Sequence, residues 1–348
     1  LGMAYTVIAG GMDLSISSTV SLSAVLTMLV INATTVDRVS PDYASFVVLL
    51  IGIVVGATVG CISGGILAAV NGRMGESFII TYAIQVIVAA VANAVVNGQF
   101  QSASYKSGMF KMLGSGVVPV LFFLIIAVIM QFILVKTAFG RNLYFLGANM
   151  EAAKMAGIRT RRIRFAAHVI CGICAGIAGV LVVARVNSAS IQQGLNYEMD
   201  AMACVAVGGT SLNGGSGSIL KVVLGVVVLG VLLNALNLLG VQANEQLIVR
   251  GAVVILAVIL DTWNKKEGGR EIMKSVGKFL KSQAILCLLA LFIVFLAISR
   301  PSFVSPTNIK NVLMDASIYG VAAMAMTIAI ITGAFDLSLS ANFAWAQI

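Results

Sequence analysis

An aspartate lies within apolar sequence near the start of the chain. Asp13 follows Gly10 and Gly11 and is followed by Ser15 and Ser17. If this sequence lies in a membrane, an ionisable side chain there is costly and indicates a functional site. The glycines let a helix break, and the serines supply oxygens that cap the next helix or bond to freed backbone groups. Two interpretations stay open: Asp13 and Ser15 line a substrate pathway, or Asp13 caps a helix near the membrane interface.

A second set of residues is typical of a docking element rather than a catalytic site. Glu151, Ala152 and Ala153 are followed, after three more residues, by Gly157. An acidic start, small residues and a glycine predict a short helix that ends in a turn. Such a helix can dock into a groove of a partner protein. A plain amphipathic connector is the alternative.

The third set combines acidic residues with a glycine-rich run. Glu198 and Asp200 precede residues 208–217, which begin with Gly208 and Gly209. Glycine-rich loops can bind phosphates, but this one lacks the Gly-Lys-Ser/Thr ending of a nucleotide-binding loop. We therefore do not expect this chain to bind ATP. Close backbone approach within a re-entrant or broken helix near residues 199–208 is the better interpretation.

The cysteines and the single histidine do not indicate a metal site or a catalytic site. Cys171 and Cys174 are spaced as a Cys-x-x-Cys, but no second pair and no histidine cluster completes a metal site. His168, the single histidine, has no acidic residue nearby in the sequence. We interpret all three as packing residues, and expect no metal, no cofactor and no catalytic residue.

The composition indicates what positions these residues. Hydrophobic residues make up 59% of the 348 positions and charged residues only 10%, whereas soluble domains are about a quarter charged. Long apolar runs reach the roughly 20 residues of a helical span, and no period-two alternation suggests a barrel. The sequence therefore predicts an all-α, polytopic transmembrane helical bundle with broken or re-entrant helices. Clear spans are predicted over residues 44–70, 78–96, 117–135 and 165–186.

Glycines recur every fourth residue in two of these spans. Such spacing places them near one helix face, where a neighbouring backbone can approach closely. We expect tight helix packing and no binding site at Gly52, Gly56, Gly60, Gly64, Gly172 and Gly176.

The net charge of +9 is concentrated in two stretches. Residues 136–164 hold seven Lys or Arg and one Glu. Residues 264–281 hold six Lys or Arg and two Glu. Basic residues in short loops between spans mark the cytoplasmic side, so both stretches are expected inside, and residues 32–43 and 98–116 outside. No aromatic or groove-reading pattern accompanies the charge, so nucleic acid is not an expected partner. Membrane lipid is.

A ten-residue motif near the start of the chain recurs near its end. Residues 8–17 and 331–340 share six of ten positions, so Asp13 and Ser15 correspond to Asp336 and Ser338. An offset of 323 residues is about the length of one small membrane protein. The sequence predicts a window on two fused copies of one membrane protein: residues 1–263 belong to the first, which lacks its N-terminal spans, 264–283 form a basic cytoplasmic linker, and 284–348 begin a truncated second unit.

Four segments together resemble the ribose-type permeases of bacterial ATP-binding-cassette importers. Residues 10–17 resemble the opening motif of that family, 137–158 its cytoplasmic coupling loop, 197–217 its third signature and 301–311 its first external loop. The resemblance covers essentially the whole chain.

The resemblance implies a transport subunit and not an enzyme. Such permeases work in pairs in the bacterial inner membrane, take a small sugar from a periplasmic binding protein, and are driven by two separate cytoplasmic ATPase subunits. On this basis Gly140 and Arg141, with Glu151, Ala152, Ala153 and Gly157, are expected to contact the ATPase. The expected substrate pathway comprises Asp13, Ser15, Asp336, Ser338, Glu198, Asp200, Gly208 and Gly209.

Other transport classes remain as alternatives. A branched-chain amino-acid or nucleoside permease would share the architecture, although Asp-Leu-Ser and Gly-Gly-Thr-Ser-Leu favour sugars. An ATP-independent transporter or channel would need no ATPase partner, so ATP dependence separates the two classes. An intramembrane enzyme would need a catalytic set that the sequence lacks.

Overall fold

The computed structural model describes residues 1–253, 255, 298, 303 and 305–326, apart from residues 38, 71–73, 106, 212–213, 243–244 and 250. Asp336, Ser338 and the predicted linker 264–283 lie outside the described residues.

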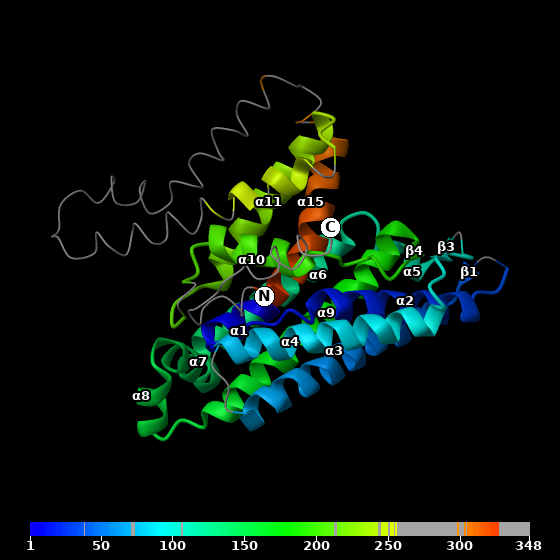
Figure 1. Cartoon of the computed structure of the whole chain (residues 1–348). Helices are drawn as coiled ribbons and strands as arrows, with labels where there is room; N and C mark the ends of the chain where they lie inside the picture. Colours follow the sequence, from blue (N-terminus) through cyan, green and yellow to red (C-terminus); the bar gives the residue numbers. More distant parts are fainter. Residues whose placement is uncertain are drawn as a thin grey trace, which may run out of the picture.

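The described part of the chain is a bundle of helices, as predicted (Figure 1). Six helices are long and apolar enough to cross a membrane: α2 (Ile16–Thr34), α3 (Asp42–Val70), α4 (Met74–Val96), α6 (Val118–Lys136), α9 (Thr160–Val186) and α11 (Ile219–Leu238). Shorter helices connect or interrupt them: α1 (Gly2–Ile8), α5 (Met109–Leu113), α7 (Ala138–Ala148), α8 (Met150–Met155) and α10 (Tyr197–Val207). A further helix, α15 (Pro306–Met326), packs against α10 and α11.

Two pairs of very short strands lie at one end of the bundle, opposite α7 and α8 (Figure 1). Strand β1 (Val39–Ser40) pairs in parallel with β3 (Ser107–Gly108), and β2 (Gln101–Ser102) pairs antiparallel with β4 (Ser188–Ala189). Residues 32–43 and 98–116 therefore share one end, and the basic stretch 136–164 lies near the other. This grouping agrees with the alternation predicted from the charges.

The predicted glycine packing is confirmed between α3 and α9. A Cβ atom added to Gly56 would lie 2.0 Å from the Gly172 carbonyl oxygen, and one added to Gly52 would lie 2.8 Å from that of Gly176. Because no side chain fits at such separations, the two backbones touch along this seam.

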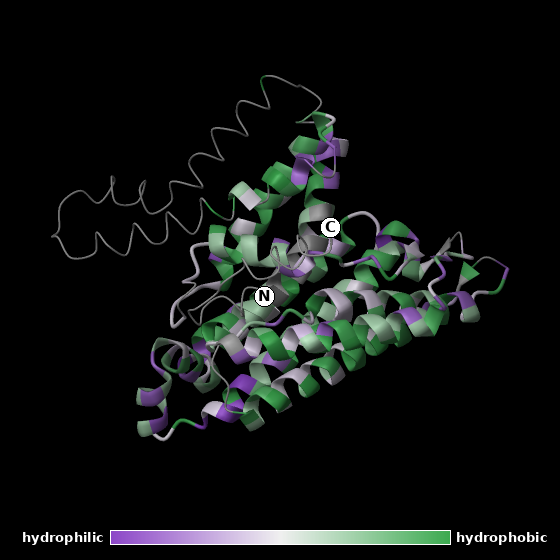
Figure 2. Ribbon diagram, viewed as in Figure 1, coloured by the Kyte–Doolittle hydropathy of each residue, from purple (hydrophilic) through white to green (hydrophobic). Residues whose placement is uncertain are grey.

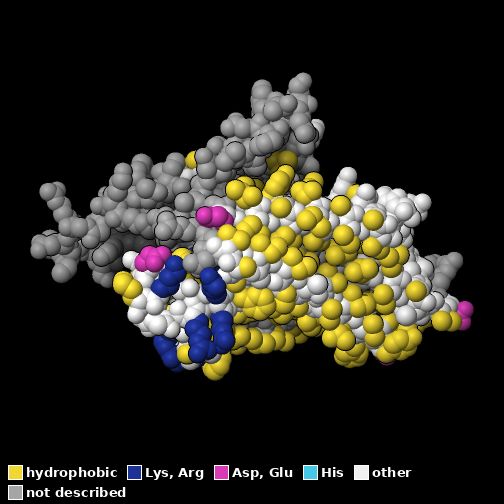
Figure 3. All heavy atoms as spheres, turned by 60° about the horizontal axis from the view of Figure 1, so that its bottom comes forward, with side chains coloured by type: hydrophobic (Ala, Val, Ile, Leu, Met, Phe, Trp, Pro, Cys, Tyr) yellow, Lys and Arg dark blue, Asp and Glu magenta, His cyan; other side chains and the backbone are white. Residues whose placement is uncertain are grey.

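The other faces of α3, α4 and α6 are apolar and exposed. Leu50, Ile87 and Val128 each leave more than half of their surface uncovered. Hydrophobic residues dominate these helices (Figure 2) and form a broad surface in the space-filling view (Figure 3). Continuous apolar surface of this kind suits contact with lipid rather than water.

Helix α9 begins earlier than the sequence predicted. The expected span started at Phe165, whereas the helix starts at Thr160 and includes Arg161, Arg162 and Arg164. The apolar run marks only the part of a helix that fits the hydrocarbon core, so the prediction left out the polar first turn.

Candidate functional site

The helix that opens the chain is broken, as Gly10 and Gly11 predicted. Helix α1 ends at Ile8 and α2 begins at Ile16. Between them Gly10 has φ of +93°, a left-handed conformation that favours glycine. The segment lies inside the bundle, so its freed backbone groups need partners there.

Helix α4 supplies those partners. The Ser77 hydroxyl accepts a hydrogen bond from the Met12 N–H at 2.9 Å and donates one to the Met12 carbonyl at 2.8 Å. One turn further along, Thr81 Oγ1 accepts from the Leu14 N–H at 3.1 Å. Two side chains on one face of α4 thus hold the broken segment in place.

Asp13 fixes the turn that leads into α2, whose N-cap is Ser15 and carries no side-chain cap hydrogen bond. Its Oδ1 accepts hydrogen bonds from the Ser15 N–H at 3.0 Å and from the Ser15 hydroxyl at 2.5 Å. Only 1% of the Asp13 surface is exposed, so this contact lies inside the bundle and not at an interface. Its Oδ2 is buried with no hydrogen-bond partner in the described part of the chain, and the Cys171 thiol lies beside the carboxylate.

A second buried carboxylate approaches the same region from α10. Glu198, in the first turn of that helix, lies against Ser17 and Gln85. Gln85 Nε2 donates to Ser17 Oγ at 2.9 Å. The Glu198 side chain is buried, and its Oε2 has no hydrogen-bond partner among the described residues.

These side chains form what we call the polar cluster: Asp13, Ser15, Ser17, Ser77, Thr81, Gln85 and Glu198. The sequence predicted three of its members, Asp13, Ser15 and Glu198. It missed the contribution of α4, although Ser77, Thr81 and Gln85 are spaced four residues apart in otherwise apolar sequence. That spacing places polar groups on one helix face and was the available signal.

Three other residues predicted for the pathway, Gly208, Gly209 and Asp200, are not members of the polar cluster. Gly208 and Gly209 follow the far end of α10, where a Cβ atom on Gly208 would come within 2.7 Å of the Lys221 carbonyl oxygen. The structure thus gives Gly208 a packing contact with α11, away from the polar cluster. Asp200 is buried in α10, one turn or less beyond Glu198.

Helix α10 is the short helix predicted near residues 199–208. Its 11 residues extend about 16 Å, half of the hydrocarbon thickness. The preceding loop lies against α2, where Ser21 donates to the Gln193 carbonyl and Gly194 packs beside Val20. Helix α10 is therefore too short to cross the hydrocarbon core by itself.

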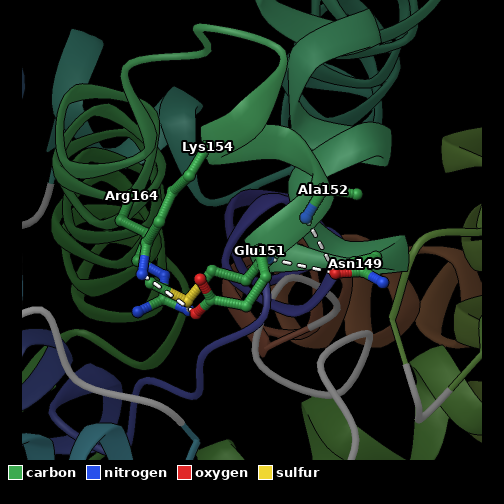
Figure 4. Close-up of polar contacts among 6 residues, drawn as sticks. Asn149, Glu151, Ala152, Lys154 and Arg164 are labelled. Atoms are coloured by element: carbon green, nitrogen blue, oxygen red, sulfur yellow. Dashed lines mark hydrogen bonds and ion pairs between the residues drawn. The ribbon is translucent and has the colours of Figure 1, made fainter.

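The predicted docking element is also a short helix (Figure 4). Asn149 caps α8 by accepting hydrogen bonds from the Glu151 and Ala152 N–H groups, both at 3.0 Å. Glu151 and Lys154 form an ion pair at 3.0 Å. Beyond the helix, Gly157 has φ of +76°, as expected for a glycine that ends a helix.

The six residues expected at an ATPase contact divide into two groups. Arg141, Glu151, Ala152 and Gly157 are exposed. Ala153 is buried, and Gly140 packs so closely against α6 that an added Cβ would lie 1.9 Å from the Leu134 carbonyl oxygen. Only the first group offers a surface to a partner.

Helix α7 connects this element to the broken helix. A Cβ atom on Gly147 would lie 1.8 Å from the Ile8 carbonyl oxygen, directly before the break. The Tyr144 hydroxyl donates to the Gly217 carbonyl at 2.7 Å, in the loop after α10. Burial raises the pKa of this hydroxyl, which keeps it protonated as a donor. Movement of α7 would therefore reach both α1 and the α10 loop.

The described residues hold six helices that can each span a membrane, together with a buried polar cluster, which is the architecture of a multi-pass membrane protein. The chain belongs to the family described as branched-chain amino acid transport system / permease component, which matches residues 1–258. It is a permease component of a transport system.

Several characterised permeases are similar to it. The ribose import permease protein RbsC of Escherichia coli K12 is 33% identical over 274 residues, which is 77% of this chain and 81% of that protein. RbsC of Bacillus subtilis 168 is 35% identical over 265 residues, which is 75% of this chain and 79% of that protein. The D-allose transport system permease protein AlsC of E. coli K12 is 34% identical over 267 residues, which is 75% of this chain and 78% of that protein. These similarities confirm the resemblance to sugar permeases. No solved structure matches the chain.

Proposed function

We propose that the protein is the membrane component of an ATP-driven importer for a small sugar, a ribose-like pentose or a hexose. A periplasmic binding protein would deliver the sugar, and the bacterial inner membrane would hold the complex. The observation that carries the proposal is the buried polar cluster beside a helix break. The named activities of the relatives, ribose and allose transport, support the choice of substrate class.

The chemistry of the polar cluster suits hydroxyl groups. Asp13 Oδ2 and Glu198 Oε2 are buried acceptors without described partners, and sugar hydroxyls are donors that would satisfy them. Gln85 can both donate and accept. None of the seven named residues of the polar cluster is a Lys or Arg that would bind the carboxylate of an amino acid, and the hydrogen-bonding groups among them suit a sugar.

We further propose that two cytoplasmic ATPase subunits drive transport and that one contacts the exposed residues Arg141, Glu151, Ala152 and Gly157. The packing of Gly147 on Ile8 supports a mechanical link between that contact and the polar cluster. Docking would push on α7, and α7 would shift the end of α1 beside the break. ATP hydrolysis would belong to the partner.

The internal repeat supports a tandem organisation of two permease halves. In this proposal residues 1–263 form the first unit, 264–283 a cytoplasmic linker and 284–348 the start of the second. Asp336 and Ser338 would then provide in the second half what Asp13 and Ser15 provide in the first.

Co-purification from membranes in mild detergent tests the ATPase contact. We expect an ATPase subunit to accompany the full-length protein and to be lost from a Glu151→Arg, Gly157→Trp variant. Asp42→Arg, a charge reversal at the opposite end of the bundle, is the matched control and should retain the subunit. If the double variant keeps the ATPase as well as the control does, the assignment of the contact fails.

A further inference from the structure

Two adjoining cavities lie at the cytoplasmic base of α9, outside the polar cluster. Their volumes are about 450 and 470 Å³, and both are lined by Ile158, Arg159 and Arg162. Arg161 lines the second cavity, beside Lys154. The two cavities together can accept a polar group larger than a single ion.

The charge of this region is not balanced within the described chain. Arg159, Arg161 and Arg162 are exposed, and none has an ion-pair partner among the residues that the structure describes. Of the two acidic side chains nearby, Glu151 is paired with Lys154 and Glu76 lies close to Arg164. Three guanidinium groups so close in sequence repel one another, and a bound anion would relieve that repulsion. Arginine in particular binds phosphate through two parallel hydrogen bonds.

The surroundings of the arginines indicate the source of the anion. Basic side chains gather beside the broad apolar surface of the bundle (Figure 3). Phe139, Ile158 and Ile163 form apolar walls within the first cavity. Phe165 follows Arg161 by four residues, so it lies on the same face of α9 one turn toward the membrane, and it is 38% exposed. A ligand here would meet positive charge at one end and apolar surface at the other.

We propose that this site binds the headgroup of an anionic phospholipid of the inner leaflet. The phosphate lies between Arg159 and Arg162, and an acyl chain runs along α9 past Phe165. Basic pockets between helices at the cytoplasmic surface are suited to such headgroups. Because Gly157 also lines the first cavity, the bound lipid would steady the turn between α8 and α9. This inference does not depend on the identity of the transported substrate.

The test measures lipid retention by native mass spectrometry. Full-length protein is equilibrated in nanodiscs of equal parts phosphatidylglycerol and phosphatidylcholine and then released into detergent. We expect phosphatidylglycerol to be retained preferentially. Arg159→Gln and Arg162→Gln should each lower its retention about fivefold, since one basic residue near an anionic headgroup contributes about that factor. Lys136→Gln, which removes an exposed cytoplasmic charge outside both cavities, should leave retention unchanged.

Three results would overturn the proposal. The first is equal retention of the two lipids by the parent protein. The second is an equal loss in Lys136→Gln, which would show a general effect of surface charge. In the third, inorganic phosphate would displace phosphatidylglycerol as effectively as a soluble short-chain phosphatidylglycerol does, which would identify a free-phosphate site. Size-exclusion profiles check folding, and the substituted side chains are exposed, so the variants should remain intact.

Discussion

At the scale of single residues, the two carboxylate oxygens of Asp13 have different surroundings. Oδ1 accepts both hydrogen bonds from Ser15, while Oδ2 is buried without a described partner. A buried carboxylate with one unsatisfied oxygen is costly. A purely structural turn would not need that cost, since a serine or threonine hydroxyl can accept a local backbone hydrogen bond as well. This difference is the basis for separating the two interpretations of Asp13.

Substitutions at Asp13 should separate its structural role from transport. Asp13→Asn keeps an acceptor for the Ser15 N–H but removes the charge, so we expect normal membrane levels and transport lowered tenfold or more, because a hydrogen bond to a charged group contributes about 1.5–3 kcal/mol. Asp13→Leu should lose both stability and transport. Substrate uptake normalised to protein in the membrane is the measurement. Normal transport by Asp13→Leu protein would remove Asp13 from the pathway.

Thr81 should stabilise the fold through the broken helix. Thr81→Val leaves the buried Leu14 N–H without its partner, and we expect a loss of about 1–3 kcal/mol in stability, seen as a lower melting temperature in detergent. Thr58→Val is the matched control, because the Thr58 hydroxyl bonds only to Val54 within its own exposed helix turn. Equal melting temperatures for the two variants would contradict the role assigned to Thr81.

At the scale of elements, the sequence predicted the features that depend on residues close together in the chain. The break at Gly10, the short helix ended by Gly157 and the glycine seam of α3 each follow from neighbouring residues. What it could not predict was pairing between distant segments. Nothing in the local sequence of Ser77 or Gln85 shows that they face Met12 and Ser17, because their partners lie more than sixty residues away. The buried position of Gly140 was likewise hidden, since it depends on how α7 folds back on α6.

The α3–α9 seam yields a prediction with an internal control. Gly56→Ala places a methyl group 2.0 Å from the Gly172 carbonyl oxygen, so the helices must separate, at a cost of about 1–3 kcal/mol. Gly65→Ala, in the same helix, meets nothing within 4 Å and should be neutral or slightly stabilising. Thermal unfolding in detergent compares them. A melting temperature for Gly56→Ala at or above that of Gly65→Ala would show that the seam is loose.

At the scale of the whole molecule, the bundle separates a lipid-facing layer from a polar interior. Helices α3, α4 and α6 expose apolar side chains, whereas α9 and α11 are mostly covered. The broken α1–α2 pair and the short α10 meet at the polar cluster, and α7 touches the end of α1 and the loop between α10 and α11. Composition alone predicted the membrane class, and the motifs predicted the transport class. The path from α8 through α7 to the break is a tertiary feature, and only the structure shows it.

Uptake by reconstituted protein tests the central proposal most directly. The full-length protein is placed in proteoliposomes with its ATPase subunit and binding protein, and entry of radiolabelled ribose and allose is followed with and without ATP. We predict that one of these sugars, or a related pentose or hexose, accumulates only when ATP is present at the ATPase side, and that Asp13→Leu protein fails to accumulate it. Sugar entry that proceeds equally without ATP would contradict the account and favour an ATP-independent transporter or channel.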